Sequence, residues 1–121
     1  MKDYDVKILK YEDKQYPECL RNIHTPPVKL YCMGNINLLN EKKKIAIIGC
    51  RDYSEYGRIV SQKFAYELAR IGFVIVSGAA RGIDSFSHKA TLNTKTGTIA
   101  VLGNGLNYIY PPENKELEER I

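Results

Sequence analysis

Three apolar, β-branched runs in this chain each end in a glycine-containing turn that leads into a helical pattern; they span residues 45–48, 72–76 and 98–102. Strand–turn–helix units repeated in this way are typical of parallel sheets with crossover helices. The carboxyl ends of such strands lie side by side, and ligands bind in the crevice outside them. We therefore predict an α/β fold: a three-layer Rossmann-like parallel sheet with helices on both faces, incomplete, with about three core strands.

The turn after the second run carries the clearest ligand signal. It spans Ser77 to Gly82 and opens directly into a helix that begins near Asp84. Glycine amides, the positive end of the helix dipole and the Arg81 guanidinium would meet there, which favours a phosphate ligand. Two interpretations are open for Ser77 and Asp84: they bind that ligand, or they only stabilise the turn. For Asp84 we favour a role in stabilising the turn. His88 lies one helical turn further on, within hydrogen-bonding reach of Asp84.

Arg51 follows the first run as Arg81 follows the second, so both guanidinium groups are expected to face the crevice and grip phosphodiesters. The alternative is that each arginine is solvent-exposed or paired with Asp52 or Asp84. Two arginines at equivalent positions favour the first interpretation.

Aromatic residues lie in the same turns. Tyr53 and Tyr110 are predicted to stack unpaired bases, whereas Phe86 is expected to pack inside the protein. Together with the family resemblance described below, which implies the glycines of the second and third turns as pocket walls, the full set of predicted DNA- or phosphate-binding residues is Gly49, Cys50, Arg51, Tyr53, Ser77, Gly78, Arg81, Gly82, Gly103, Asn104, Gly105 and Tyr110.

The helical pattern after the first run is the longest. Ser54 is its expected N-cap and Gly72 its closing glycine, and Asn114 is expected to cap the last helix. The expected core face of the long helix is Val60, Phe64, Leu68 and Ile71, with Ala65 beside them.

The first 44 residues do not show the strand–turn–helix pattern of the rest of the chain. Residues 1–16 have no clear period, residues 18–23 suggest a short helix, and residues 28–33 suggest a strand. We predict that residues 1–44 form an N-terminal extension packing on the sheet, and that residues 45–121 form a partial Rossmann-like DNA-binding domain.

Composition narrows the function. The whole chain has a net charge of +4, but its acidic residues are concentrated at the end: residues 113–121 hold four acids and two bases. Residues 1–112 therefore carry 16 bases against 10 acids, a net charge of +6. Such a positive charge suits a polyanionic partner. Three cysteines without a CxxC pair, and no leader or long apolar stretch, favour a cytoplasmic protein without a membrane partner. With two histidines, no phosphate loop and no GxGxxG turn, we expect no metal, no cofactor and no enzymatic activity.

Several segments together resemble the DprA/Smf family of DNA-processing proteins. The matching segments are YP at 16–17, PP at 26–27, IAIIGCR at 45–51, SGAARGID at 77–84, His88, TIAVLGNGL at 98–106 and YPPEN at 110–114. The resemblance covers about residues 16–121 in unbroken order.

The resemblance implies a Rossmann-like fold that binds single-stranded DNA in a basic pocket at the strand ends, and a role in natural transformation, with loading of a RecA-type recombinase. It implies no enzymatic activity. Cys50 stands where the family usually has serine, and Asn107 where it usually has aspartate. The family's later segments are not present in this sequence, so we expect an unpaired edge at residues 45–48 that a second copy or a complementing chain covers.

Two other hypotheses stay open at this point. One is a nucleotide-binding or phosphoribohydrolase-like Rossmann protein, against which the lack of a PGGxGT segment argues. The other is a truncated remnant that folds by association and binds nothing tightly.

Overall fold

The protein is described by a computed structural model over residues 6–106 and 111–121, and it divides into two compact units, residues 2–42 and 43–121. That residues 1–44 pack on the sheet stays a prediction. In chain order the elements are β1 (Lys7–Lys10), α1 (Glu18–Arg21), β2 (Lys29–Cys32), η1 (Ile36–Asn40), β3 (Lys44–Ala46), α2 (Glu55–Arg70), β4 (Val74–Ser77), α3 (Ile83–Thr91), β5 (Thr98–Ala100), η2 (Pro112–Asn114) and α4 (Lys115–Arg120).

The N-terminal unit is a two-stranded antiparallel ribbon, β1 and β2, built over a small core. Leu9, Tyr16 and Ile36 form that core, and the Tyr16 hydroxyl donates to the Pro27 carbonyl at 2.7 Å. The strand and short helix expected near residues 28–33 and 18–23 are present as β2 and α1. Strand β1 was not predicted, because four residues are too few to show an alternation.

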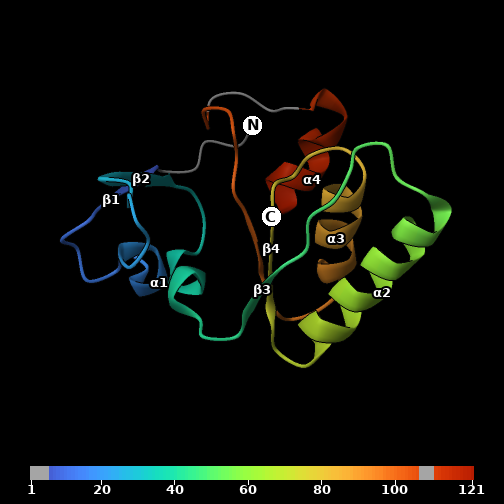
Figure 1. The fold of residues 1–121 in the computed structure, drawn as a ribbon, viewed down its shortest axis with the longest axis horizontal. Helices are drawn as coiled ribbons and strands as arrows, with labels where there is room; N and C mark the ends of the chain where they lie inside the picture. Colours follow the sequence, from blue (N-terminus) through green and yellow to red (C-terminus); the bar gives the residue numbers. More distant parts are fainter. Residues whose placement is uncertain (1–5, 107–110) are drawn as a thin grey trace. The chain divides into compact units, whose positions relative to one another are not determined.

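The C-terminal unit contains the predicted parallel sheet, with strand order β3-β4-β5 (Figure 1). Ile45 lies beside Ile75, and Ile75 lies beside Thr98, so β5 begins one residue further along the sheet than β3 and β4. The predicted α/β class with three parallel strands is confirmed. Among the described strands, β3 pairs only with β4 and is therefore an edge strand.

Helix α2 has the ends that its sequence predicts. The Ser54 hydroxyl accepts a hydrogen bond from the Gly57 amide at 2.9 Å, which satisfies one of the free amides of the first turn. At the other end Gly72 adopts a φ of 101°, and the Phe73 amide returns to the Leu68 carbonyl at 3.0 Å. This is a Schellman closure, in which glycine tolerates the left-handed backbone.

The buried face of α2 is not the predicted one. Phe64 and Ile71 are 58% and 61% exposed, whereas Ala65 and Ala69 are fully buried against Ile75 of β4. The helix carries one stripe of large apolar side chains and another of small ones. The small stripe faces the sheet because alanines let the helix approach closely, and periodicity alone cannot choose between the two.

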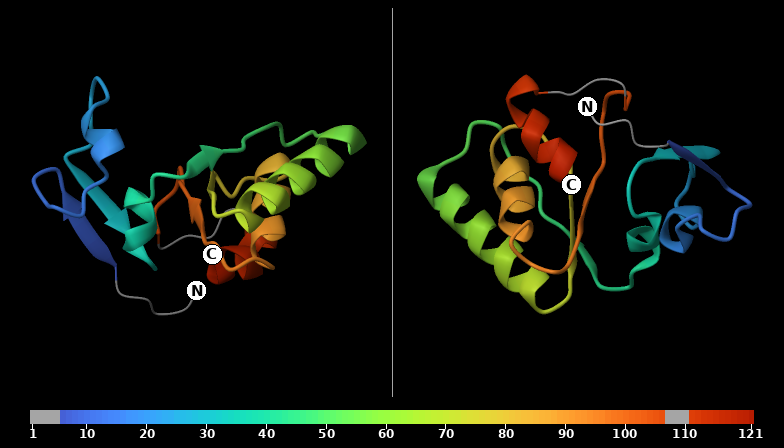
Figure 2. Two further views of the ribbon diagram at one scale, coloured as in Figure 1. Left: turned by 90° about the horizontal axis from the view of Figure 1, so that it is seen from below. Right: turned by 180° about the vertical axis from the view of Figure 1, so that it is seen from behind.

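The layering also differs in one respect from the expectation of helices on both faces. Because the strand order advances in one direction, two right-handed crossovers place α2 and α3 on the same face of the sheet (Figure 2). Helix α4 contacts α3. Within residues 6–106 and 111–121, no helix is long and apolar enough to cross a bilayer.

Candidate nucleic-acid interface

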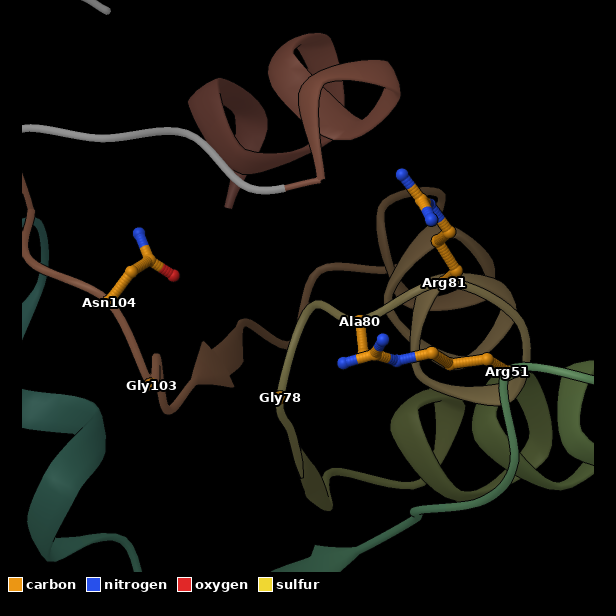
Figure 3. Close-up of a pocket in the computed structure, with 6 residues that line it drawn as sticks. All are labelled: Arg51, Gly78, Ala80, Arg81, Gly103 and Asn104. Carbon is orange, nitrogen blue, oxygen red and sulfur yellow. The ribbon is translucent and has the colours of Figure 1, made fainter.

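The turns that follow β3, β4 and β5 surround a pocket of about 330 Å³ (Figure 3). The Ile47 amide donates to the Val76 carbonyl at 3.0 Å, and the Val101 amide to the Ser77 carbonyl at 2.9 Å, which continues the sheet up to these turns. The sequence predicted this meeting of strand ends. The pocket is lined by Arg51, Gly78, Ala80, Arg81, Gly103 and Asn104.

The two arginines do not converge as predicted. The Arg51 side chain extends across the pocket towards the turn at Gly78, whereas Arg81 points away towards η2 (Figure 3). The Arg81 guanidinium binds both carboxylate oxygens of Glu113, with Nε–Oε2 at 2.7 Å and an Nη2–Oε1 hydrogen bond of 3.2 Å. A hydrogen bond to its own backbone amide and the bond to Arg81 hold the pKa of Glu113 below its usual range. An acid does pair with Arg81, but it is Glu113 and neither Asp52 nor Asp84.

Arg51 presents the free positive charge of the pocket. Its side chain is exposed, and among the described residues its guanidinium makes no hydrogen bond and no ion pair. A guanidinium group can contact a phosphate through two parallel N–H donors. Arg51 is therefore the residue of the pocket best placed to hold an anion.

The start of α3 is largely filled by the protein itself. The Gly78 amide donates to Asp84 Oδ2 at 3.2 Å, and the Ile83 amide donates to the Cys50 carbonyl at 3.4 Å. Two of the amide groups near the helix start are thus committed. The Gly78 amide is thus bonded within the protein, and Asp84 holds the turn, which is the role favoured for it from the sequence.

His88 holds the neighbouring amide of the same turn. The Ala79 amide donates to His88 Nε2 at 3.1 Å, so the ring proton is on Nδ1. Nδ1–H then donates to the Thr98 hydroxyl at 2.9 Å, because that hydroxyl gives its own proton to the Ile75 carbonyl at 2.6 Å. Burial lowers the pKa of His88 to about 4, and the charge of Asp84 only partly opposes this shift. His88 is therefore neutral at neutral pH, and it does not form the predicted hydrogen bond with Asp84.

Asn114 completes this support from another part of the chain. Its side-chain amide donates to the Ala79 carbonyl at 3.0 Å and to the Ser85 hydroxyl at 2.7 Å, and that hydroxyl donates to the Ala80 carbonyl at 2.5 Å. Ala79 needs this support because its φ of 56° lies in the left-handed region. Asn114 makes no side-chain cap for α4, contrary to the prediction. The sequence signal for its role is the YPPEN segment.

Gly82 allows the backbone of the turn after β3 to approach the turn after β4 closely. Its φ is 81°, and a β-carbon there would lie 2.5 Å from the Cys50 carbonyl oxygen and 2.8 Å from that of Arg51. Only glycine fits such an approach of one backbone to another. Gly82 therefore places the β3 turn, and with it Arg51, directly over the start of α3.

Several of the other predicted site residues lie outside the lining of the pocket. The Ser77 hydroxyl donates to the Ile47 carbonyl at 2.7 Å, so it joins two strands and is not part of the pocket lining. The Tyr53 ring is 43% exposed and packs edge-on against Phe86 at 4.7 Å. Gly49, Cys50 and Gly105 are exposed near the strand ends but are not among the lining residues, and Tyr110 lies outside the described residues. Ala80 lines the pocket and was not predicted, because an alanine carries no chemical signal.

The sequence model of the DNA recombination-mediator protein A family matches residues 7–121. The chain belongs to this family.

Among the described residues, no cluster of three or more potential metal ligands occurs.

Named members of the DprA/Smf family are similar over nearly the whole chain. The DNA processing protein DprA of Bacillus subtilis is 38% identical over 120 residues, which are 99% of this chain and 40% of that protein. The DprA of Streptococcus pneumoniae is 41% identical over 109 residues, or 90% of this chain and 38% of that protein. The chain thus spans about two fifths of the length of these relatives.

Solved DprA structures have the same fold. The crystal structure of the Streptococcus pneumoniae protein matches with a TM-score of 0.86 and 38% identity, over 94% of this chain and 40% of that one. The Helicobacter pylori protein matches with a TM-score of 0.85 and 34% identity, over 98% of this chain and 52% of that one. The latter is described by its single-stranded DNA binding mode.

Proposed function

We propose that this chain binds single-stranded DNA in the pocket at the carboxyl ends of β3, β4 and β5, as a DNA-processing module of the cytoplasm. The observation that carries the proposal is the Arg51 guanidinium, which has no partner among the described residues and extends into a pocket that Gly78 and Gly103 also line. A cation in such a pocket suits the sugar–phosphate backbone of a nucleic acid, and a phosphate contact does not distinguish one base sequence from another. The Helicobacter pylori relative supports the choice of ligand.

Fluorescence anisotropy with labelled oligo-dT tests this proposal, with duplex DNA and mononucleotides as competitors. We expect unlabelled oligo-dT to displace the probe, and mononucleotides to fail at the same nucleotide concentration, because a single phosphate contact is weak on its own. Displacement by mononucleotides at lower concentrations than by oligo-dT would show a nucleotide-binding protein instead.

We further propose that the bound strand is passed to a RecA-type recombinase, as in natural transformation. The family's description as recombination mediators supports this step. The test is the DNA-dependent ATPase activity of a RecA-type recombinase on DNA coated with single-strand-binding protein, with and without this chain. Stimulation is expected. If saturating protein gives none while DNA binding persists, the recombinase step is wrong for this chain.

We also propose that a second copy of the chain, or a complementing chain, pairs with β3. Strand β3 has a free edge among the described strands; Ile45 within it is 39% exposed, and Ile48, which follows it, is 75% exposed. An exposed apolar edge invites pairing with another strand. Pairing of two β3 strands would join the two sheets into one.

A further inference from the structure

The outer face of the β1–β2 ribbon is formed by Ile8, Lys10, Lys29 and Tyr31, and we call it the ribbon face. Side chains alternate along a strand, so Leu9 and Leu30 point to the other side, where Leu9 belongs to the core and Leu30 packs against it. The ribbon face is not part of that core. A face without a function would be expected to carry polar side chains of mixed charge.

The apolar members of the ribbon face are unusually exposed. Ile8 is 51% exposed and Tyr31 is 60% exposed, and the two are direct cross-strand partners. An accessible aromatic ring with an aliphatic neighbour is a surface on which a planar group can stack.

The charged members of this face repel each other. Lys10 and Lys29 are also direct cross-strand partners, and like charges at such positions destabilise a ribbon. The Tyr11–Val28 backbone hydrogen bond makes the next pair, Lys10 and Lys29, a non-hydrogen-bonded one, in which side chains lie closest. Within the described part of the chain, neither lysine forms an ion pair. An anion between the two ammonium groups would relieve this repulsion.

We propose that the ribbon face is a second contact site for single-stranded nucleic acid, with a base stacked on Tyr31 and a phosphate held between Lys10 and Lys29. The ring and the lysine pair are two residues apart along each strand, or about 7 Å, which one nucleotide can span. The proposal rests on the proposed function, because it assumes that the ligand is a single strand. A protein partner would need an acidic complement to the lysines, and a nucleic acid supplies phosphates and rings together.

Binding of the full chain to an oligo-dT longer than the ~4–16 nucleotides of a typical single site tests the proposal. Replacing both lysines, Lys10→Gln with Lys29→Gln, should flatten the dependence of log K on log salt by about 0.7, since the pair holds one phosphate and each phosphate contact contributes about 0.7. The matched control removes two exposed lysines of the other unit, Lys63→Gln with Lys95→Gln, and should leave the slope unchanged.

The aromatic contact is tested separately. Tyr31→Ser should weaken binding at least about fivefold, whereas Tyr31→Phe, which keeps the ring, should bind like the wild type. Photocrosslinking with an oligonucleotide that contains 5-iododeoxyuridine should label Tyr31 directly. Circular dichroism of each variant checks that the ribbon is intact.

The outcomes separate this inference from the proposed function. If Arg51→Ala weakens binding but the lysine pair and Tyr31→Ser have no effect, the ribbon-face site is wrong and the pocket remains. If the ribbon-face variants weaken binding and Arg51→Ala does not, the pocket is wrong and the ribbon-face site remains. If the wild type binds no oligonucleotide, both proposals are wrong.

Discussion

Arg51 and Arg81 occupy equivalent positions after β3 and β4, yet the structure gives them different environments. Arg81 is held by Glu113, a residue 32 positions away, whereas Arg51 has no partner among the described residues. Sequence spacing placed both arginines near the pocket, which is observed. It could not reveal the ion pair, because Glu113 is brought to Arg81 only by the return of the chain after β5.

Glu113→Gln is predicted to strengthen binding of oligo-dT. The substitution releases Arg81 from this carboxylate and removes a negative charge beside the pocket, so a phosphate meets less repulsion. Anisotropy at several salt concentrations should show tighter binding at low salt, and a slope of log K against log salt that is steeper by about 0.7 if Arg81 gains a phosphate. Glu116→Gln on α4 makes the same charge change and should have a smaller effect. Equal effects of the two variants would show that Glu113 has no special role.

His88 is predicted to stay neutral far below the usual pH range of histidine. Its folded pKa of about 4 lies below the unfolded value of about 6.5, so the unfolded chain binds the proton more readily. The neutral His88 ring therefore contributes to the free energy of unfolding in full above pH 6.5. This contribution, on the order of 3 kcal/mol, is lost as the pH falls towards 4. Ring NMR signals of His88 and His24 during an acid titration provide the measurement. A midpoint near 6.5 for His88 would contradict a buried, neutral ring that accepts the hydrogen bond from the Ala79 amide.

At the scale of elements, the ends of α2 were easier to predict than its face. Ser54 and Gly72 act within one turn of the helix, so their local chemistry is visible in the sequence. The choice between the Phe64–Ile71 stripe and the Ala65–Ala69 stripe depends on how closely the helix approaches β4, which is a tertiary property. Likewise, β1 is too short for its pattern to be recognised without β2 beside it.

The orientation of α2 predicts opposite sensitivities on its two stripes. Ala69→Leu should destabilise the fold by about 1–3 kcal/mol, because the added carbons have no space between α2 and the sheet. Phe64→Ala should cost less than about 1 kcal/mol, well below the ~3–5 kcal/mol typical of a buried phenylalanine. Urea unfolding of both variants measures this difference. A larger loss for Phe64→Ala than for Ala69→Leu would mean that the predicted face, and not the observed one, is buried.

At the scale of the whole molecule, the sequence indicated the α/β class, the parallel strands and the meeting of their carboxyl ends. These follow from repeated local patterns and from the handedness of crossovers. Of the network that shapes the β4 turn, only the role of Asp84 was predicted, because His88 and Asn114 each look like an ordinary helix residue. Their role depends on which backbone groups lie nearby after folding.

Ala46→Pro is predicted to weaken self-association through β3. The Ile47 amide faces β4, so the neighbouring Ala46 amide faces the free edge, and proline removes that donor. Light scattering over a concentration series should show dimers for the wild type and mainly monomers for the variant, with similar circular dichroism spectra. A wild type that stays monomeric at high concentration would contradict pairing through this edge.

The central claim is that Arg51 holds a phosphate of single-stranded DNA, and the salt dependence of oligo-dT binding tests it most directly. Arg70, in the last turn of α2, lies shortly before the amino end of β4 and so away from the carboxyl ends of the strands, which makes Arg70→Ala a control with the same charge change. We predict that Arg51→Ala weakens binding and flattens the slope of log K against log salt by about 0.7, while Arg70→Ala leaves the slope unchanged. Equal slopes for Arg51→Ala and the wild type would contradict the claim.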